Sequence, residues 1–302
     1  MARAKQTLPR NLAILVVVVG LGVQIVTTCY KKSDTTPSTK QQPPSTASTA
    51  TPNQTGTIHL EMGIPTGGDG EPSYLLKRKQ YALSYNGTKN VPNWVSYHLN
   101  ASYFGTVERK QGQFMPDPDL PPQFYKVRHQ DYSNSGFDRG HMVRSEERTA
   151  TREDNDATFY TTNLLPQRHD LNAGPWLRLE EFCQFLAVRK KKELYIICGG
   201  IFPKNYQTIG KQNNIAVPSH CFKIIVVLES GQGVRDVNEN TTVIAAIMPN
   251  VEGIKKEQWR QYQTTVDEIE QQTGYDFLTA VPQKIQEAIE RRIATSLVAM
   301  AQ

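Results

Sequence analysis

Cysteines are few in this sequence, and none is placed as a zinc ligand would be. The four cysteines among the 302 residues are Cys29, Cys183, Cys198 and Cys221, with no Cys-x-x-Cys pair and no cluster of cysteine with histidine. Structural zinc sites take four Cys or His ligands at short spacings, so a zinc domain is not indicated. The three cysteines after residue 58 allow at most one disulfide, and a buried free thiol is the alternative for each.

The larger part of the chain also lacks a net charge. The sequence carries 34 Lys and Arg against 29 Asp and Glu, a formal charge of +5. Six of the basic residues but only one of the acidic residues lie in residues 1–57, so residues 58–302 hold equal numbers of both. Bulk charge therefore says nothing about a nucleic acid partner, and any anion site has to be local.

No internal repeat is visible, which excludes a solenoid, and composition divides the chain into three parts. Residues 1–29 combine a basic start with the apolar run Leu12–Val26, as an export signal or membrane anchor does. Val26-Thr27-Thr28-Cys29 resembles a lipoprotein cleavage site, so a lipidated Cys29, a cleaved signal and an uncleaved anchor all stay open. We expect an exported protein that is extracellular, periplasmic or membrane-anchored.

Residues 30–57 are rich in Ser, Thr, Pro and Gln and have almost no apolar side chains to bury. Such a segment is typical of a disordered linker. Residues 58–302 have the composition of one globular domain, which at roughly 245 residues is long enough to bury a sizeable core.

The pattern of residues 58–302 predicts an α+β fold, with a mixed or antiparallel central sheet flanked by helices. Alternating or β-branched runs predict strands at residues 80–85, 94–99, 193–198, 221–228 and 242–248. The first two runs are expected to form an antiparallel hairpin.

Three helices are predicted in the second half of the chain. One begins near Pro175 and ends at the basic run 189–192, where cations complement the helix dipole; a nucleic acid patch is the alternative for this run. Thr265–Glu268 forms a capping box that opens a helix stopping at Gly274. Another helix starts at Pro282, with Ile285, Ile289, Ile293 and Leu297 four residues apart.

The most informative motif is Asp138-Arg139-Gly140-His141. A histidine near its ordinary pKa of about 6.5 can act as a general base at neutral pH. The other five histidines lie in or beside predicted strands or in polar loops. Taken alone, the motif is more often a turn than a site. A β-prone run at residues 156–163 is expected to form a strand that returns from the loop after His141.

The helix that follows carries a possible polar site at its start. On a helical wheel Trp176, Leu179, Cys183 and Leu186 form an apolar arc with Glu180 at its margin. Glu181 points to solvent, so Glu180 is the carboxylate that can face the protein interior at the start of this helix. Asn172 stands before this helix, where an N-cap is the alternative to a functional role.

Three strings now combine: Gly136–His141, Thr162–Gln167 and Asn172–Glu180. Together they resemble the DNA/RNA non-specific endonucleases of the ββα-metal class, which include endonuclease G and the exported bacterial sugar-nonspecific nucleases. The resemblance spans residues 60–280. It implies a ββα-metal active-site motif and metal-dependent hydrolysis of phosphodiester bonds in DNA and RNA, with 5′-phosphate products.

The resemblance also implies roles for individual residues. His141 would be the general base that activates water, and Asn172 would be the single protein ligand of Mg²⁺, for which Mn²⁺ is a possible substitute. Glu180 would orient the water molecules of the metal, and Arg139 and Arg109 would hold the scissile phosphate.

Asp138 would position the hairpin. Some members of this family carry an arginine one turn after the glutamate, where this chain has Gln184.

The expected partners are DNA and RNA, bound through their backbones and without sequence preference, because phosphate contacts carry no base information. A membrane partner through the N-terminal segment and a protein inhibitor are further possibilities. Two competing functions are a noncatalytic surface DNA-binding protein with a degenerate nuclease domain and a phosphodiesterase for small nucleotides.

Overall fold

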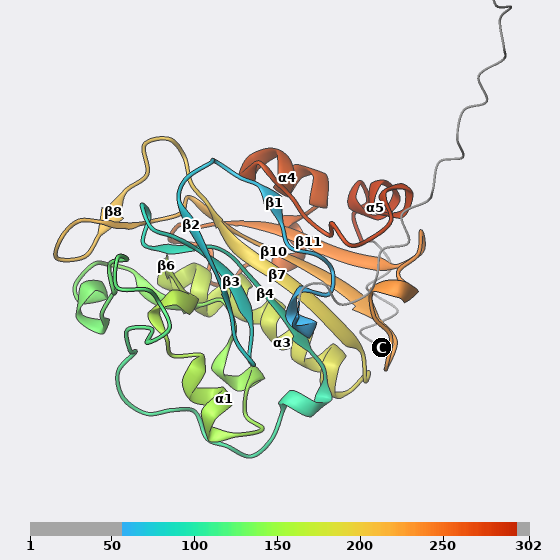
Figure 1. The fold of residues 1–302 in the computed structure, drawn as a ribbon, viewed down its shortest axis with the longest axis horizontal. Coiled ribbons are helices and arrows are strands. Elements are labelled where there is room, and N and C mark those ends of the chain that lie inside the picture. The colour runs from blue at the N-terminus through green and yellow to red at the C-terminus, as the bar shows by residue number, and fades with distance from the viewer. Residues whose placement is uncertain (1–55, 295–302) are drawn as a thin grey trace, which may run out of the picture. The chain divides into compact units, whose positions relative to one another are not determined.

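A seven-stranded antiparallel sheet is the centre of residues 56–294, the part of the chain that the computed structural model describes (Figure 1). Its strand order is β12-β11-β10-β7-β4-β3-β2. The strands are β2 (Ser73–Lys77), β3 (Ala82–Asn86), β4 (Val91–Leu99), β7 (Glu193–Ile201), β10 (His220–Leu228), β11 (Thr242–Pro249) and β12 (Gln263–Thr264). The expected α+β class is confirmed, and every pairing within this sheet is antiparallel.

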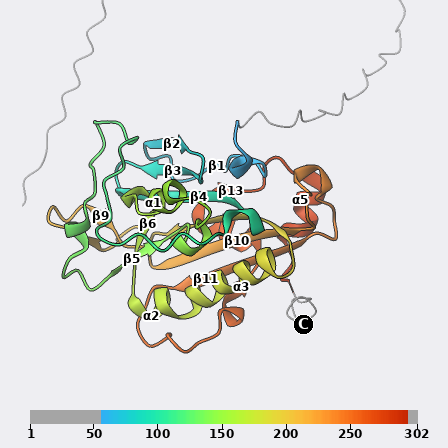
Figure 2. The same cartoon turned by 90° about the horizontal axis from the view of Figure 1, so that it is seen from below.

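Both faces of the sheet are buried, because successive side chains of a strand enter different cores. In β7, Leu194 and Ile196 join the core that packs on α3 (Leu177–Val188), whereas Tyr195 and Ile197 join the core at α4 (Val266–Thr273) and α5 (Gln283–Glu290). Figure 2 shows α3 and α5 on opposite sides of the sheet. This burial explains why the central strands read as continuous apolar runs in the sequence.

A smaller two-stranded sheet lies beside α3 and carries the Asp-Arg-Gly-His motif. It pairs β5 (Asp138–His141) with β6 (Leu164–Gln167) in antiparallel register. The prediction of a strand at residues 156–163 was therefore wrong, and the returning strand comes later. Residues 152–157 form α1 (Arg152–Ala157) instead, because Thr151 caps it by accepting a hydrogen bond from the Asp154 N–H.

The remaining elements are short. The strand pairs are β1 (Thr66–Gly67) with β13 (Tyr275–Asp276), and β8 (Thr208–Ile209) with β9 (Ile215–Ala216). One turn of helix, α2 (His169–Leu171), precedes a wide turn at Asn172–Trp176. The 3-10 turns are Ile58–Leu60, Ala101–Tyr103, His129–Tyr132, Ser145–Glu147, Thr161–Asn163, Val234–Asp236 and Trp259–Tyr262.

The C-terminal helices follow the sequence prediction with one correction. Thr265 caps α4 by accepting from the Glu268 N–H, and Gly274 ends it in the left-handed conformation. Helix α5 ends at Glu290, so Ile293 lies beyond it and is 49 % exposed rather than on its apolar face. Leu297 and the predicted export segment and linker, up to residue 55, lie outside the described residues.

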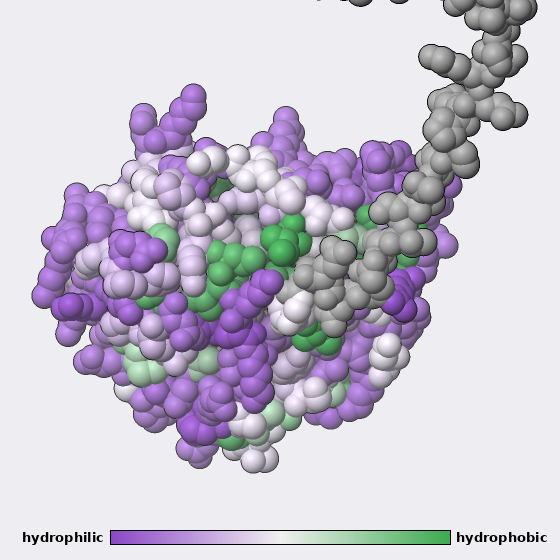
Figure 3. Space-filling view, viewed as in Figure 1, coloured by the Kyte–Doolittle hydropathy of each residue, from purple (hydrophilic) through white to green (hydrophobic). Residues whose placement is uncertain are grey.

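Cys183, Cys198 and Cys221 are free and buried, so the thiol alternative is the one confirmed. Within residues 56–294, no helix combines the length and apolar character needed to cross a membrane. The face drawn in Figure 3 is mostly hydrophilic, with its largest group of hydrophobic residues near the centre and smaller ones scattered elsewhere. The apolar side chains of the described residues are thus gathered mainly in the two cores.

Candidate active site

The pairing of β5 with β6 places His141. Gly140 lies opposite Leu165 and His141 opposite Leu164. A Cβ on Gly140 would stand 2.1 Å from the Gln167 Oε1, because the buried Gln167 side chain crosses the glycine. Glycine in the motif therefore serves close packing across the hairpin, and this packing sets the position of the next residue.

The His141 ring is enclosed by aromatic side chains. Phe114 and Phe159 lie 5.1 and 5.3 Å from it, centroid to centroid, and the Nε2 atom is buried with no hydrogen-bond partner. Burial and then the charge of Arg109 lower the pKa of His141 to about 3. The expectation of a pKa near 6.5 was wrong, because the Nε2 atom is buried and the charge of Arg109 acts on the ring. It is held in the neutral form, which can accept a proton.

Asn172 is held by the carboxylate of the same motif. Its Nδ2 donates to the Asp138 Oδ2 at 3.0 Å, and the His169 Nδ1 lies 2.9 Å from that same oxygen. The Asn172 backbone is helical and the residue lies in a wide turn broken at Gly174. Asn172 is therefore not an N-cap, and its side-chain amide is held by Asp138.

Glu180 is buried on α3, whereas Glu181 is exposed, as the helical wheel predicted. Its Oε1 lies 3.6 Å from the Nζ of Lys223, a wholly buried residue of β10. The Lys223 ammonium also lies 4.3 Å from the ring centroid of Trp176. Burial raises the pKa of Glu180 to about 7, against the opposing charge of Lys223. Helix α3 and strand β10 of the central sheet thus meet at a buried ion pair.

The two arginines named from the resemblance lie in different surroundings. Arg109 lies 5.1 Å over the ring of Phe159, and its Nη1 donates to the Ser145 Oγ and to the Glu146 Oε1 at 3.2 and 3.3 Å. Arg139 donates through Nη2 to the carbonyl of His129 at 2.8 Å. Arg109 is therefore directly beside the histidine, whereas Arg139 is engaged by the backbone of a neighbouring turn.

The polar atoms around Asn172 fit a hydrated divalent cation. Because the Asn172 Nδ2 donates to Asp138, its carbonyl oxygen is the atom available as a ligand, and amide oxygens are hard donors that suit such ions. The buried Glu180 Oε1 has no hydrogen-bond partner in the described part of the chain, so it can accept from a metal-bound water. A cluster of Asp267, Glu270 and Glu290 belongs to α4 and α5, across the sheet.

Sequence patterns missed several residues of this region. Glu147 is fully buried, and burial raises its pKa. Lys223 and His169 were also missed, as were Arg144 and Glu146. Lys223 is the single charged residue within the apolar run 221–228. Its position could have indicated a buried ion pair, because a charge inside a buried strand needs a partner. The others lie in polar turns, where charged residues are ordinary.

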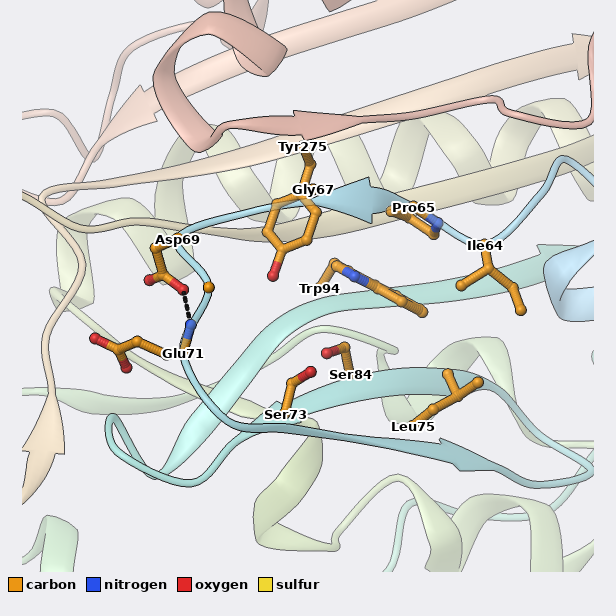
Figure 4. A pocket seen from close by; sticks show the side chains of 11 residues that line it. Ile64, Pro65, Gly67, Asp69, Glu71, Ser73, Leu75, Ser84, Trp94 and Tyr275 are labelled. Atoms are coloured by element: carbon orange, nitrogen blue, oxygen red, sulfur yellow. Dashed lines mark hydrogen bonds between the residues drawn. The ribbon is translucent and has the colours of Figure 1, made fainter. Parts of the chain in front are cut away.

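A separate pocket lies between β1, β13 and the β2-β3-β4 edge of the sheet (Figure 4). Asp69 and Glu71 line it, and both pair with Lys89, at 2.6 and 3.0 Å. Two carboxylates on one ammonium leave a negative balance. This pocket is therefore poorly suited to phosphate, unlike the arginine-lined region at His141.

Comparison with known sequences relates the chain to nucleases. A sequence model of DNA/RNA non-specific endonucleases matches residues 57–284. A protein named Nuclease from Nostoc sp. is 43 % identical over 243 residues, which are 78 % of this chain and 86 % of that protein. The human mitochondrial nuclease EXOG is 32 % identical over 228 residues, 72 % of this chain and 59 % of that protein. The present chain thus spans about six tenths of the length of human EXOG.

Comparison with solved structures agrees. A chain in the crystal structure of the EndoG/EndoGI complex, which addresses the mechanism of EndoG inhibition, is 28 % identical with a TM-score of 0.64. The likeness covers 78 % of this chain and 96 % of that one. The range matched by the family model includes every candidate residue from Arg109 to Glu180.

The contact between Gly140 and Gln167 can be tested through stability. We expect Gly140→Ala to lower the free energy of unfolding by about 1 to 3 kcal/mol, because the added methyl overpacks the hairpin. Urea unfolding followed by circular dichroism measures this. On a Gln167→Ala background the same change should cost clearly less, since the obstructing side chain is gone. Equal losses on both backgrounds would contradict the packing role of Gly140.

The low pKa of His141 predicts that its ring does not titrate near neutral pH. Because the folded-state pKa lies near 3, the ring stays neutral as the pH falls from 8 to about 5. The ring chemical shifts of His141, followed by NMR and assigned by their loss in His141→Ala, should therefore stay constant over this range. Circular dichroism at each pH shows that the protein remains folded. A titration of these resonances centred near pH 6.5 in folded protein would contradict the assignment of a buried, neutral imidazole.

Proposed function

The chain belongs to the DNA/RNA non-specific endonuclease family and is a nuclease that hydrolyses phosphodiester bonds, and from this premise we propose its mechanism. His141 acts as the general base, and Asn172 holds one divalent cation, Mg²⁺ with Mn²⁺ as a substitute. The observation that carries the proposal is the hydrogen bond from Asn172 to Asp138. It ties the ligand residue to the same short strand that presents the histidine.

The reaction assigns a task to each side chain. His141 Nε2 takes a proton from a water molecule, whose oxygen attacks phosphorus while the bond to the 3′ oxygen breaks. The 3′ oxygen leaves and takes a proton from a solvent water, so the products are a 3′-hydroxyl and a 5′-phosphate. The bound ion supplies charge stabilisation to the phosphate and to the leaving oxygen. Arg109 offers charge-assisted hydrogen bonds to the phosphate, and the aromatic rings around His141 exclude bulk water.

Glu180 is proposed to orient the water shell of the ion. The buried ion pair with Lys223 supports this role, because it holds the carboxylate in one place. The Glu180 Oε1 accepts no hydrogen bond from the described residues and can accept one from water. Arg139 is proposed to act on the phosphate at a second position, after release from the His129 carbonyl. This assignment rests on the resemblance alone.

The substrates proposed are DNA and RNA without base preference, since the groups gathered here recognise phosphate. Export is supported by the basic and apolar pattern of residues 1–29. A protein inhibitor is a further proposal, prompted by the inhibited EndoG complex. Membrane attachment through the N-terminal segment is proposed on the same composition as export.

Digestion of plasmid DNA and of RNA, with and without EDTA, tests the central proposal. Both substrates should be degraded to 5′-phosphate ends in Mg²⁺, and neither in EDTA. Cleavage of a small nucleotide diester alone would support the phosphodiesterase alternative. Binding of DNA without cleavage would support a degenerate domain. Activity that persists in EDTA would overturn the metal-dependent mechanism.

The role of His141 predicts a large loss on substitution. His141→Ala should lower kcat by about 10² to 10⁴-fold, which is the contribution typical of a general base. Metal affinity, measured by isothermal titration calorimetry, should stay within about threefold of wild type. Activity above about one per cent of wild type would rule out the general-base role.

Glu180 and Glu181 form a matched pair on one helix. Glu180→Gln should lower activity by about 10 to 100-fold, the range typical of groups that orient metal ligands. Glu181→Gln removes the same charge from the exposed face and should change activity by less than twofold. Thermal unfolding of both variants reports any loss from leaving Lys223 unpaired. Equal effects of the two substitutions on activity would contradict the role of Glu180.

A further inference from the structure

The carboxylate of Glu146 bridges two arginines, Arg109 and Arg144, near His141. The Glu146 Oε1 accepts from the Arg109 Nη1 at 3.3 Å, and its Oε2 accepts from the Arg144 Nε at 3.0 Å. Each carboxylate oxygen thus has its own guanidinium. The 3-10 turn Ser145–Glu147, which follows β5 closely, brings Arg144 and Glu146 to Arg109.

This bridge lies beside His141. The guanidinium of Arg109 stacks at 5.1 Å over Phe159, whose ring meets the His141 ring edge-on at 5.3 Å. After burial, the charges of Arg109 and Arg144 lower the pKa of His141 and that of Glu146 raises it. Contact geometry and charge therefore agree that the bridged carboxylate is close to the base.

The arrangement has the chemistry of an anion site. A phosphodiester, like a carboxylate, spreads one negative charge over two equivalent oxygens, and paired guanidinium groups suit both. Arg144 also has a donor to spare, because its Nη1 is buried and has no hydrogen-bond partner in the part of the chain described. The side chain of Glu146 is 36 % exposed and that of Arg109 45 % exposed, so an incoming anion can reach the bridge.

We propose that Arg109 and Arg144 together bind the substrate phosphate, and that Glu146 fills the place of that phosphate until nucleic acid displaces it. The inference rests on the proposed function and adds Arg144 as a phosphate-binding residue and Glu146 as an internal competitor. The alternative role for Glu146 is to hold the arginines in position. The two roles predict opposite changes in affinity when the carboxylate is removed.

The first test measures binding without catalysis. On the His141→Ala background in EDTA, fluorescence anisotropy with a labelled single-stranded DNA oligonucleotide gives the Kd at one fixed salt concentration. Glu146→Gln and Glu146→Ala should both bind about threefold to tenfold more tightly, since substrate no longer competes with the carboxylate. Glu153→Gln, which removes the same charge from an exposed position on α1, should change the Kd by less than twofold. Weaker or unchanged binding by both Glu146 variants would overturn the competitor role.

The second test concerns Arg144. Arg144→Gln should weaken binding about tenfold or more, the range of a lost charge-assisted contact, and Arg144→Lys should recover only part of this. The slope of log Kd against log salt should fall by about 0.7 for Arg144→Gln, because one phosphate contact to a single strand is lost. A merely structural arginine would leave this slope unchanged, and that result would overturn the assignment. Thermal unfolding of each variant confirms that the fold is intact.

Steady-state kinetics with His141 restored separates this inference from the proposed function. Glu146→Gln should lower KM below the wild-type value, since substrate no longer competes with the carboxylate. If the wild-type protein fails to cleave nucleic acid, the proposed function fails. If the wild type cleaves and Glu146→Gln raises KM, only the inference about Glu146 fails.

Discussion

The buried ion pair between Lys223 and Glu180 joins helix α3 to strand β10 of the central sheet. Lys223 comes from β10 in the middle of the sheet, and Glu180 comes from α3, which packs on that sheet. Burial of charged groups is costly unless they are paired, and such a pair contributes less to stability than its Coulomb energy suggests. Its presence is better explained by position, because it holds the Glu180 carboxylate of α3 in one place against β10.

Other contacts extend this scaffold to the reacting groups. Gln167 packs across Gly140 and places the histidine, and Asp138 holds the amide of Asn172. His141 and Asn172, the proposed base and the proposed metal ligand, are thus linked through Asp138 of one short hairpin. Residues carried or held by regular elements are positioned more precisely than residues on loops.

Electrostatics in this protein is local rather than global. Residues 58–302 carry equal numbers of basic and acidic residues, yet Arg109 and Arg144 converge beside a neutral histidine. Glu146 accepts one hydrogen bond from each arginine, which prevents two like charges from facing each other without a counterion. A domain with no net charge can thus present a strong anion site, because the Coulomb interaction at contact distance outweighs the distant background.

Much of the fold and part of the site followed from the sequence. The hairpin of β3 and β4, the cap at Thr265 and the choice of Glu180 over Glu181 depend on local periodicity and capping, which short stretches of sequence encode directly. The strand predicted at residues 156–163 failed for a related reason. Its β-prone residues were outweighed by a helix cap at Thr151 and by Thr158, whose hydroxyl donates to the carbonyl of Asn155.

By itself, the sequence determined the class of fold, the family and the three strings Gly136–His141, Thr162–Gln167 and Asn172–Glu180. Each of these features is encoded by residues that are contiguous in the chain. Only the tertiary structure decided that the His141 pKa lies far below its usual value and that Asn172 is bonded to Asp138 rather than capping a helix. It alone also placed Lys223 against Glu180 and Arg144 against Glu146. Each of these depends on groups distant in sequence or on burial, and solvent exclusion and charge proximity arise only when the chain has folded.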